Sequence, residues 1–371
     1  MSERGAIVKS VQRGMAVAAA LIAGLIPTAT STAAPSVASS ARPTGQAATS
    51  CSTVATIPVG PAGNVPTGVA GVTAVNPRTG KIYVTSNNGG VIGSGQVEVI
   101  NGTTNTVVAT VPVGDSAAGV AVNPRTNKIY VAFRSDPSTG AGAVAVIDGT
   151  TNTVVATVPV GFGPFGVAVN PRTNRVYVAN TNGGGVSVIS GRTDKVIATI
   201  PVSISPIAIA VNPRTNKIYV ISQTGNTVQV ISGRANKVVA RVHVGFTPAG
   251  VAVNPRTNKI YVTFVNIAAG LNHNKVLVIS GRTNKVVTRI PVNIEPIGVA
   301  VNPRSRTIYV AGAPVHVRSG FLLVISGRTN HVVATAPAGG LPFDAAVNPR
   351  TRTIYVTNGD GDTVVFTCRH G

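Results

Sequence analysis

Residues 166–180 read G-V-A-V-N-P-R-T-N-R-V-Y-V-A-N, and variants of this stretch recur along the chain. Each copy joins a strand ending in V-N-P-R, through a short polar turn, to a strand centred on I-Y-V or V-Y-V. The copies are spaced by 42 to 48 residues, and each contains one of the seven tyrosines of the chain. A fixed period of this size is typical of repeat architectures, whose units bury their apolar faces against neighbours. The prolines that mark the seven copies are Pro77, Pro124, Pro171, Pro213, Pro255, Pro303 and Pro349.

One full repeat, residues 166–202, predicts four short strands, a to d, joined by tight turns. The strand-like runs are rich in Val and Ile, and Asn, Gly, Pro or Thr residues separate them. Four strands in about 45 residues match a blade of a β-propeller, and seven such units complete a ring. A stacked solenoid is the competing architecture, but it normally needs distinctive capping units. We therefore expect an all-β, seven-bladed propeller with four antiparallel strands in each blade.

The two ends of the repeat region predict how this ring closes. Residues 52–60 read as a lone strand d, whereas the last repeat supplies only strands a, b and c. The amino-terminal strand is therefore expected to complete the seventh blade. The only two cysteines, Cys51 and Cys368, fall at positions that flank the c–d turn in ordinary blades. We expect them to form a disulfide in place of the missing turn, as an oxidising compartment permits.

The repeated motif resembles the YVTN family of β-propeller repeats. The resemblance rests on V-N-P-R-T-N-K-I-Y-V followed by V-x-V-I-S-G-R-T-N-K-V-V-A, and it covers residues 52–368. The name motif is best preserved at Tyr355-Val356-Thr357-Asn358, and the other copies vary in its last two positions. The resemblance implies a propeller in a secreted or surface-associated prokaryotic protein. It implies no shared activity, so function has to be argued from the site.

The residues before the repeats have the layout of an export signal. Arg4, Lys9 and Arg13 precede an apolar run over residues 15–27, and small residues follow it. We expect residues 1–33 to be a cleaved signal peptide, residues 34–50 a linker rich in Ala, Ser and Pro, and residues 51–371 the propeller. An uncleaved membrane anchor is the alternative, although the run is shorter than a spanning helix requires. Every later apolar run has the length of a strand, so we expect a secreted protein with no other membrane segment.

Basic residues concentrate in two sets of turns. After residue 33 the chain has 28 basic and 9 acidic residues, and 21 of the basic ones lie in the a–b and c–d turns. Strands alternate in direction, so both sets of turns are expected on one end of the ring, with Asp148 and Asp194 as its acids. The arginines predicted to form an anion-binding face are Arg78, Arg125, Arg172, Arg214, Arg256, Arg304 and Arg350 in the a–b turns and Arg192, Arg234, Arg282 and Arg328 in the c–d turns.

This charge has two interpretations. A broad positive field would attract polyanions such as cell-wall polymers, acidic polysaccharides or nucleic acids. Alternatively, Asn-Pro-Arg-Thr-Asn is simply a favourable turn, and duplicating it seven times multiplies its charge. Aromatic residues for base stacking are missing from these turns, which argues against sequence-specific nucleic-acid binding.

The opposite end of the ring carries the b–c and d–a loops and a candidate catalytic group. His273, Glu295, His316 and Asp344 fall in the loops of blades 5 to 7. Asp344 stands where blades 2 to 6 have only Gly or Ala. Two histidines and two carboxylates suit a divalent metal or acid–base chemistry, which gives the alternative of a lyase or lactonase-like hydrolase.

The preferred hypothesis from sequence is a non-enzymatic, monomeric binding module without a cofactor. Its expected partner is a polyanion or another component of the cell surface. The long b–c loops leave a protein partner open, because variable loops on a rigid scaffold often carry function. The chain has no CxxC pair, no HExxH, no P-loop and no G-x-S-x-G motif, so the common signatures of redox, zinc-protease, nucleotide and serine-hydrolase sites are absent from its sequence.

Overall fold

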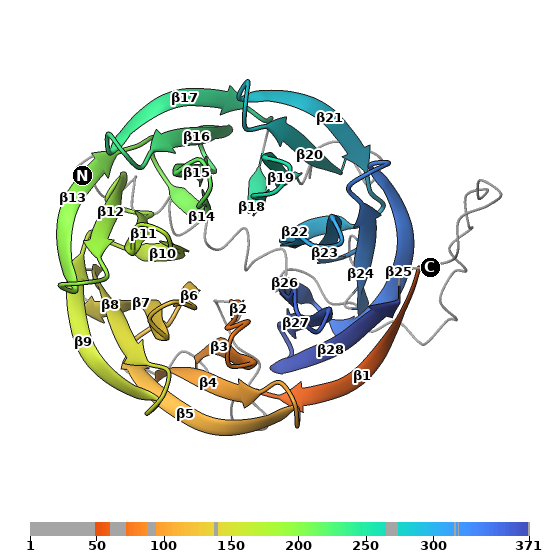
Figure 1. Ribbon diagram of the computed structural model, residues 1–371, viewed down its shortest axis with the longest axis horizontal. Coiled ribbons are helices and arrows are strands. Elements are labelled where there is room, and N and C mark those ends of the chain that lie inside the picture. Colours follow the sequence, from red (N-terminus) through yellow and green to blue (C-terminus); the bar gives the residue numbers. More distant parts are fainter. Residues whose placement is uncertain are drawn as a thin grey trace, which may run out of the picture.

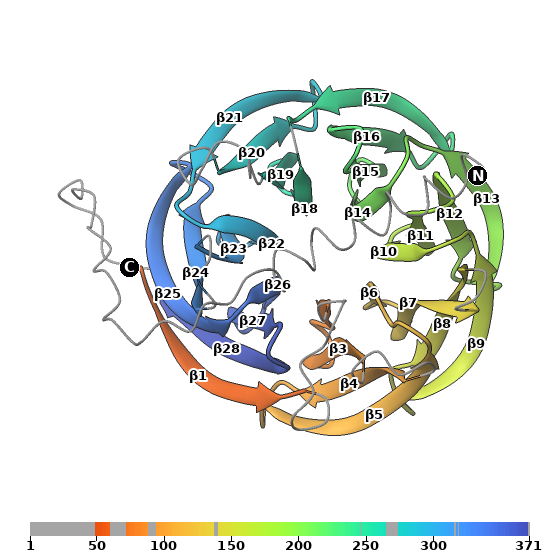
Figure 2. The same ribbon diagram turned by 180° about the vertical axis from the view of Figure 1, so that it is seen from behind.

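A computed structural model describes residues 49–59, 72–87, 94–136, 140–245, 247–264, 274–314, 317 and 319–369. Within these described residues the chain forms seven sheets, each of four antiparallel strands, and no helix. The sheets stand side by side around a central axis and form a closed ring (Figure 1), which is equally complete when seen from behind (Figure 2). The expected seven-bladed propeller is therefore confirmed.

In blades 1 to 6 the strands a to d follow one another in chain order from the axis outward. The strands of blades 1 and 2 are β2 (Thr73–Val75), β3 (Lys81–Asn87), β4 (Gly95–Asn101), β5 (Thr106–Gly114), β6 (Val120–Asn123), β7 (Lys128–Asp136), β8 (Ala141–Asp148) and β9 (Thr153–Val160). Those of blades 3 and 4 are β10 (Pro164–Asn170), β11 (Arg175–Asn180), β12 (Gly185–Ser190), β13 (Lys195–Pro201), β14 (Pro206–Asn212), β15 (Lys217–Ser222), β16 (Thr227–Ser232) and β17 (Lys237–His243). Those of blades 5 and 6 are β18 (Pro248–Asn254), β19 (Lys259–Phe264), β20 (Lys275–Ser280), β21 (Lys285–Pro291), β22 (Glu295–Asn302), β23 (Thr307–Ala313), β24 (Ser319–Ser326) and β25 (His331–Gly340).

The seventh blade joins the two ends of the described chain. It consists of β26 (Pro342–Asn348), β27 (Thr353–Asn358), β28 (Asp362–Arg369) and, on its outer edge, β1 (Ser50–Pro58). Cys51 of β1 lies directly opposite Cys368 of β28, and the two form a disulfide across 317 residues of sequence. Both predictions about ring closure, the borrowed strand and the disulfide, are confirmed.

The N-P-R turn is built by its asparagine. In blade 2 the Asn123 side chain accepts a hydrogen bond from the backbone N–H of Arg125 at 3.0 Å, and all seven copies repeat this bond at the same length. The turn ends at Asn127 with a φ of 57°, a left-handed conformation that asparagine tolerates better than most residues. The repeated sequence is therefore explained by local turn chemistry.

The same asparagines also connect neighbouring blades. Asn123 is fully buried, and its Nδ2 donates to Oδ1 of Asn174 in the a–b turn of blade 3 at 2.7 Å. We call this bond an asparagine latch. Three more junctions have it at 2.8 Å, namely Asn76 to Asn127, Asn170 to Asn216 and Asn212 to Asn258. One side chain thus shapes its own turn and fixes the next blade.

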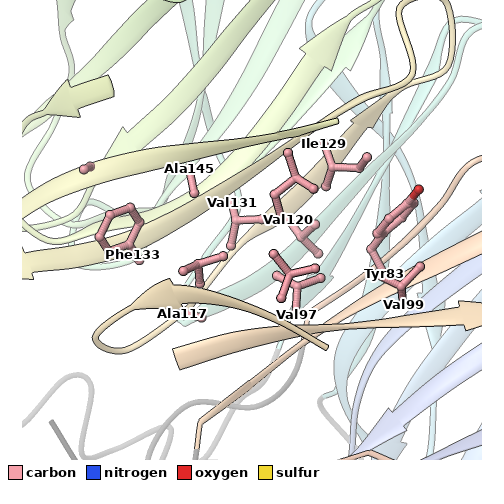
Figure 3. Packing of buried hydrophobic residues seen from close by; sticks show 13 residues of the cluster. Tyr83, Val97, Val99, Ala117, Val120, Ile129, Val131, Phe133 and Ala145 are labelled. Atoms are coloured by element: carbon pink, nitrogen blue, oxygen red, sulfur yellow. The ribbon is translucent and has the colours of Figure 1, made fainter. Parts of the chain in front are cut away.

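Apolar side chains fill the space between blades. At the junction of blades 1 and 2, Val97 and Val99 of β4 pack against Ile129 and Val131 of β7, and all four are buried (Figure 3). Tyr83 lies at the edge of this cluster and is fully buried, as are its counterparts in the other copies. β-branched residues suit such a surface because they pack well on pleated strands. The core is therefore a series of junctions between blades.

We predict that Asn123→Ala lowers the free energy of unfolding by about 2 kcal/mol. The substitution removes the cap of Arg125 and the latch to Asn174, and it leaves buried backbone and side-chain groups without a partner. Chemical denaturation measures the change. Thr103→Ala, at an exposed position of the c–d turn on the same end of blade 1, is a control with an expected loss below that value, and an equal loss in both would contradict the role of the latch.

Candidate anion-binding face

Hydrogen bonds place the a–b and c–d turns at one end of the ring. The backbone N–H of Gly149 in the c–d turn of blade 2 donates to the carbonyl of Asn127 in its a–b turn at 2.8 Å. The glycines of the c–d turns in blades 3 and 4 make the same bond to Asn174 and Asn216. We call this end the basic face and the opposite end the loop face. The prediction that the two sets of turns share one end is confirmed by these contacts.

All eleven arginines proposed from sequence are exposed on this face. The seven in the a–b turns have a backbone fixed by the asparagine cap, so a rigid turn presents each side chain to solvent. Arg304 also donates from Nη1 to the carbonyl of Pro349 in the next blade at 3.3 Å. The exposed set is Arg78, Arg125, Arg172, Arg192, Arg214, Arg234, Arg256, Arg282, Arg304, Arg328 and Arg350.

A second group of basic residues on this face has a structural task that the sequence reading missed. Lys81 at the start of β3 donates to the carbonyl of Gly149 in the next blade at 2.8 Å. Arg175 and Lys217 reach Gly233 and Gly281 in the same way, at 2.7 and 2.8 Å. Lys128 instead pairs with Asp194 of blade 3 at 2.7 Å. These four cations hold the c–d turn of the following blade.

The two acids of the basic face offset its charge only in blades 2 and 3. The carboxylate of Asp148 accepts the backbone N–H of Thr150 at 2.7 Å, and mainly this bond lowers the pKa of Asp148. Asp194 is already engaged by Lys128. The remaining blades have no acidic residue in their a–b or c–d turns. Every blade therefore has at least one exposed arginine on this face.

On the loop face, two of the four candidate catalytic residues can be placed. Glu295 begins β22 and Asp344 lies on β26, and both are half-buried, while His273 and His316 fall outside the described residues. Among the described residues, no three His, Cys, Asp or Glu side chains lie close enough together to hold a metal ion. The grouping of the four residues remains a prediction.

Asp344 has a clear structural partner. Its Oδ2 accepts a hydrogen bond from the backbone N–H of Thr73 on β2 at 2.9 Å, which links blade 7 to blade 1 near the axis. The residue is half-buried, but surrounding protein atoms enclose its carboxylate. This burial raises the pKa of Asp344 to about 6, although the N–H groups of Thr73 and Ala345 act in the opposite direction.

Blades 2, 3, 5 and 6 have a glycine at this position and no room for such a side chain. A Cβ at Gly250 would lie 2.5 Å from the carbonyl oxygen of Ile297, and one at Gly298 would lie 2.6 Å from Cα of Asp344. Asp344 itself faces the three-residue strand β2 of blade 1. Its carboxylate is therefore specific to the junction at which the ring closes.

Glu98 is a buried carboxylate that the sequence reading did not single out. It lies on β4 with 4% of its surface exposed, and its oxygens accept hydrogen bonds from Gln96 at 2.8 Å and Thr110 at 2.6 Å. The corresponding residues of blades 2 to 4 are Ala145, Ser187 and Gln229. This departure from the repeat was visible in the sequence. The uncharged side chains of Gln96 and Thr110 thus supply hydrogen bonds to the buried Glu98 carboxylate.

Comparisons with known proteins support the fold. A hydrazine synthase structure from Kuenenia stuttgartiensis is similar with a TM-score of 0.66 over 81% of this chain and 95% of that chain, at 18% sequence identity. An identity this low shows a shared fold alone. No protein-family model and no curated protein matches the sequence, so the resemblance to YVTN repeats rests on the motif itself. None of the described residues forms a helix long and apolar enough to cross a membrane.

Proposed function

We propose that this propeller is a secreted or surface-associated binding module whose basic face engages polyanions. The observation that carries the proposal is the exposure of all eleven turn arginines on one end of the ring. Outside blades 2 and 3 there is no acidic residue in the a–b or c–d turns, and asparagine caps fix the backbone of the a–b turns. Because the backbone of the a–b turns is already fixed, binding through their arginines does not have to order it, and less conformational freedom is lost.

The distribution of charge favours an extended ligand over a small one. The arginines recur in every blade, so a flexible chain of anionic groups would contact several turns at once. Each added contact is intramolecular once the first has formed, which raises the overall affinity. Charged groups further apart than about 8 Å are screened at physiological salt, so binding should depend strongly on ionic strength. Cell-wall polymers, acidic polysaccharides and nucleic acids share this chemistry.

The compartment belongs to the same proposal. The apolar run and small residues before position 34 are typical of export. The Cys51–Cys368 disulfide fits an oxidising environment, in which such bonds persist. An anionic polymer outside the cytoplasm is therefore the partner class that we expect.

A salt titration tests this function. Wild-type protein should bind a fluorescent single-stranded DNA, used as a generic polyanion, with an affinity that falls steeply as salt rises. Arg172→Gln combined with Arg214→Gln should weaken binding and reduce the slope of log affinity against log salt by about 1 per arginine. The matched control is Arg241→Gln with Arg289→Gln, which removes two exposed charges from the outer strands β17 and β21.

Two results would overturn the proposal. The first is that wild-type protein does not bind DNA or heparin at low salt. The second is that the outer-strand control loses as much affinity as the basic-face variant. The second result would mean that net charge alone, and not this face, attracts the ligand.

A further inference from the structure

Blades 6 and 7 break the repeat at one position of the basic face. The fourth residue of the a–b turn is Gly80 in blade 1 and asparagine in blades 2 to 5, but it is Arg306 in blade 6 and Arg352 in blade 7. Both arginines keep the left-handed backbone of the turn, with φ values of 60° and 64°. A large side chain rarely adopts this conformation, and asparagine tolerates it better. The turn alone therefore does not explain either arginine.

The same two substitutions remove two asparagine latches. Asn254 of blade 5 and Asn302 of blade 6 are fully buried, and the Nδ2 of each lacks a hydrogen-bond partner among the described residues. In blades 1 to 4 the equivalent Nδ2 donates to the turn asparagine of the next blade. Arg306 and Arg352 occupy the positions at which that acceptor would lie. The left-handed backbone of the two arginines and the loss of the two latches both lower the stability of the fold, as is common at functional sites.

In exchange, both basic residues of each of these two a–b turns are exposed, whereas in blades 1 to 5 the second basic residue of the turn is half-buried. Arg304, Arg306, Arg350 and Arg352, which we call the arginine quartet, are all exposed. Arg304 reaches across the junction to the carbonyl of Pro349 at 3.3 Å. The positive charge of Arg352 also opposes the rise in the pKa of Tyr309 in blade 6 that burial causes. The two salt bridges found among the described residues lie elsewhere, at Lys128–Asp194 and Arg134–Asp115.

We propose that the arginine quartet is the primary anchoring site of the basic face and binds two adjacent phosphate groups of the ligand. This inference rests on the proposed function and gives it a location and a ligand chemistry. Each guanidinium offers a planar fork of donors that matches phosphate oxygens in pairs, which the ammonium group of lysine does not. Threonines, Thr307 and Thr353, stand in these two turns where blades 1 to 5 have Lys or Arg, so the positive charge here is carried by arginine alone.

Restoring the repeat provides the test. Arg306→Asn with Arg352→Asn supplies the missing acceptors for Asn254 and Asn302 and should raise the melting temperature. It should also reduce the affinity for inorganic tripolyphosphate at least tenfold in calorimetric titrations. The matched control, Arg125→Asn with Arg172→Asn, removes the same charge from the a–b turns of blades 2 and 3 and should lose less than threefold. A variant that becomes more stable while binding less well cannot owe its loss to unfolding.

The outcomes separate this inference from the proposed function. The role of the quartet as anchoring site would be contradicted if the two double variants lost equal affinity for tripolyphosphate. It would also be contradicted if the protein bound single-stranded DNA but not tripolyphosphate. In either case the basic face as a whole would remain the polyanion site. Equal affinity for polyglutamate and polyphosphate would overturn the assignment to phosphate. Wild-type protein that binds none of these anions at low salt would overturn the proposed function and the quartet together.

Discussion

Loss of the Cys51–Cys368 disulfide is expected to lower the free energy of unfolding by about 5 kcal/mol, an upper value from the entropy of closing so long a loop. The bond joins residues that are 317 positions apart, and it fixes β1 as the fourth strand of blade 7. Without it, the unfolded chain regains the freedom of its two ends. The measurement is a denaturant titration of Cys51→Ser with Cys368→Ser against wild type.

Chemical reduction separates the covalent bond from the side chains. Wild-type protein in a thiol reductant should match the double serine variant, because both lack the bond while the reduced protein keeps its sulfur atoms. Cys368 is buried at 4% exposure, so a serine variant that is much less stable than the reduced protein would indicate a packing defect. Unchanged stability in both would show that the hydrogen bonds between β1 and β28 suffice for closure.

Asp344→Asn is expected to raise the free energy of unfolding at pH 7 by about 2 to 3 kcal/mol. Burial raises the pKa of Asp344 in the folded protein to about 6, above its value of about 4 in an unfolded chain. The folded state therefore binds the proton more tightly, so this group stabilises the fold below pH 4 and loses that contribution as pH rises through 6. Asparagine is neutral throughout and still offers an oxygen to the N–H of Thr73.

The difference in stability between wild type and Asp344→Asn isolates this titration from all others. It should be small at pH 4, grow between pH 4 and pH 6, and remain constant above that range. Asp148→Asn is a control of opposite sign, because hydrogen bonds lower the pKa of Asp148 and its contribution is lost as pH falls. A pH-independent difference for Asp344→Asn would contradict the buried, hard-to-ionise carboxylate.

Much of the fold could be predicted because each blade repeats the same local sequence pattern. The V-N-P-R turn and the following I-Y-V strand identify strands a and b without reference to the rest of the chain. The missing last strand and the positions of Cys51 and Cys368 then determine how the ends meet. The location of the eleven arginines on one end of the ring followed from strand direction alone.

The contacts between blades could not be predicted in this way. Whether Lys128 faces solvent or Asp194 depends on how far one blade is rotated from the next, which no local pattern encodes. The double role of Asn123 is hidden for the same reason, since only one of its two bonds is local. Arg306 and Arg352 were visible as departures from T-N-K, but their significance depends on the φ angles and on the unpartnered amides of Asn254 and Asn302.

Disulfide closure also decides how the propeller would transmit mechanical tension. Traction applied at residues 49 and 369 meets the bond between Cys51 and Cys368 almost at once, and it passes from one end to the other through two sulfur atoms. The 317 residues of separation between the cysteines correspond to about 1,100 Å of extended chain, all of it shielded from the load. The oxidised propeller would therefore not lengthen under load, whereas the reduced propeller could unfold and extend.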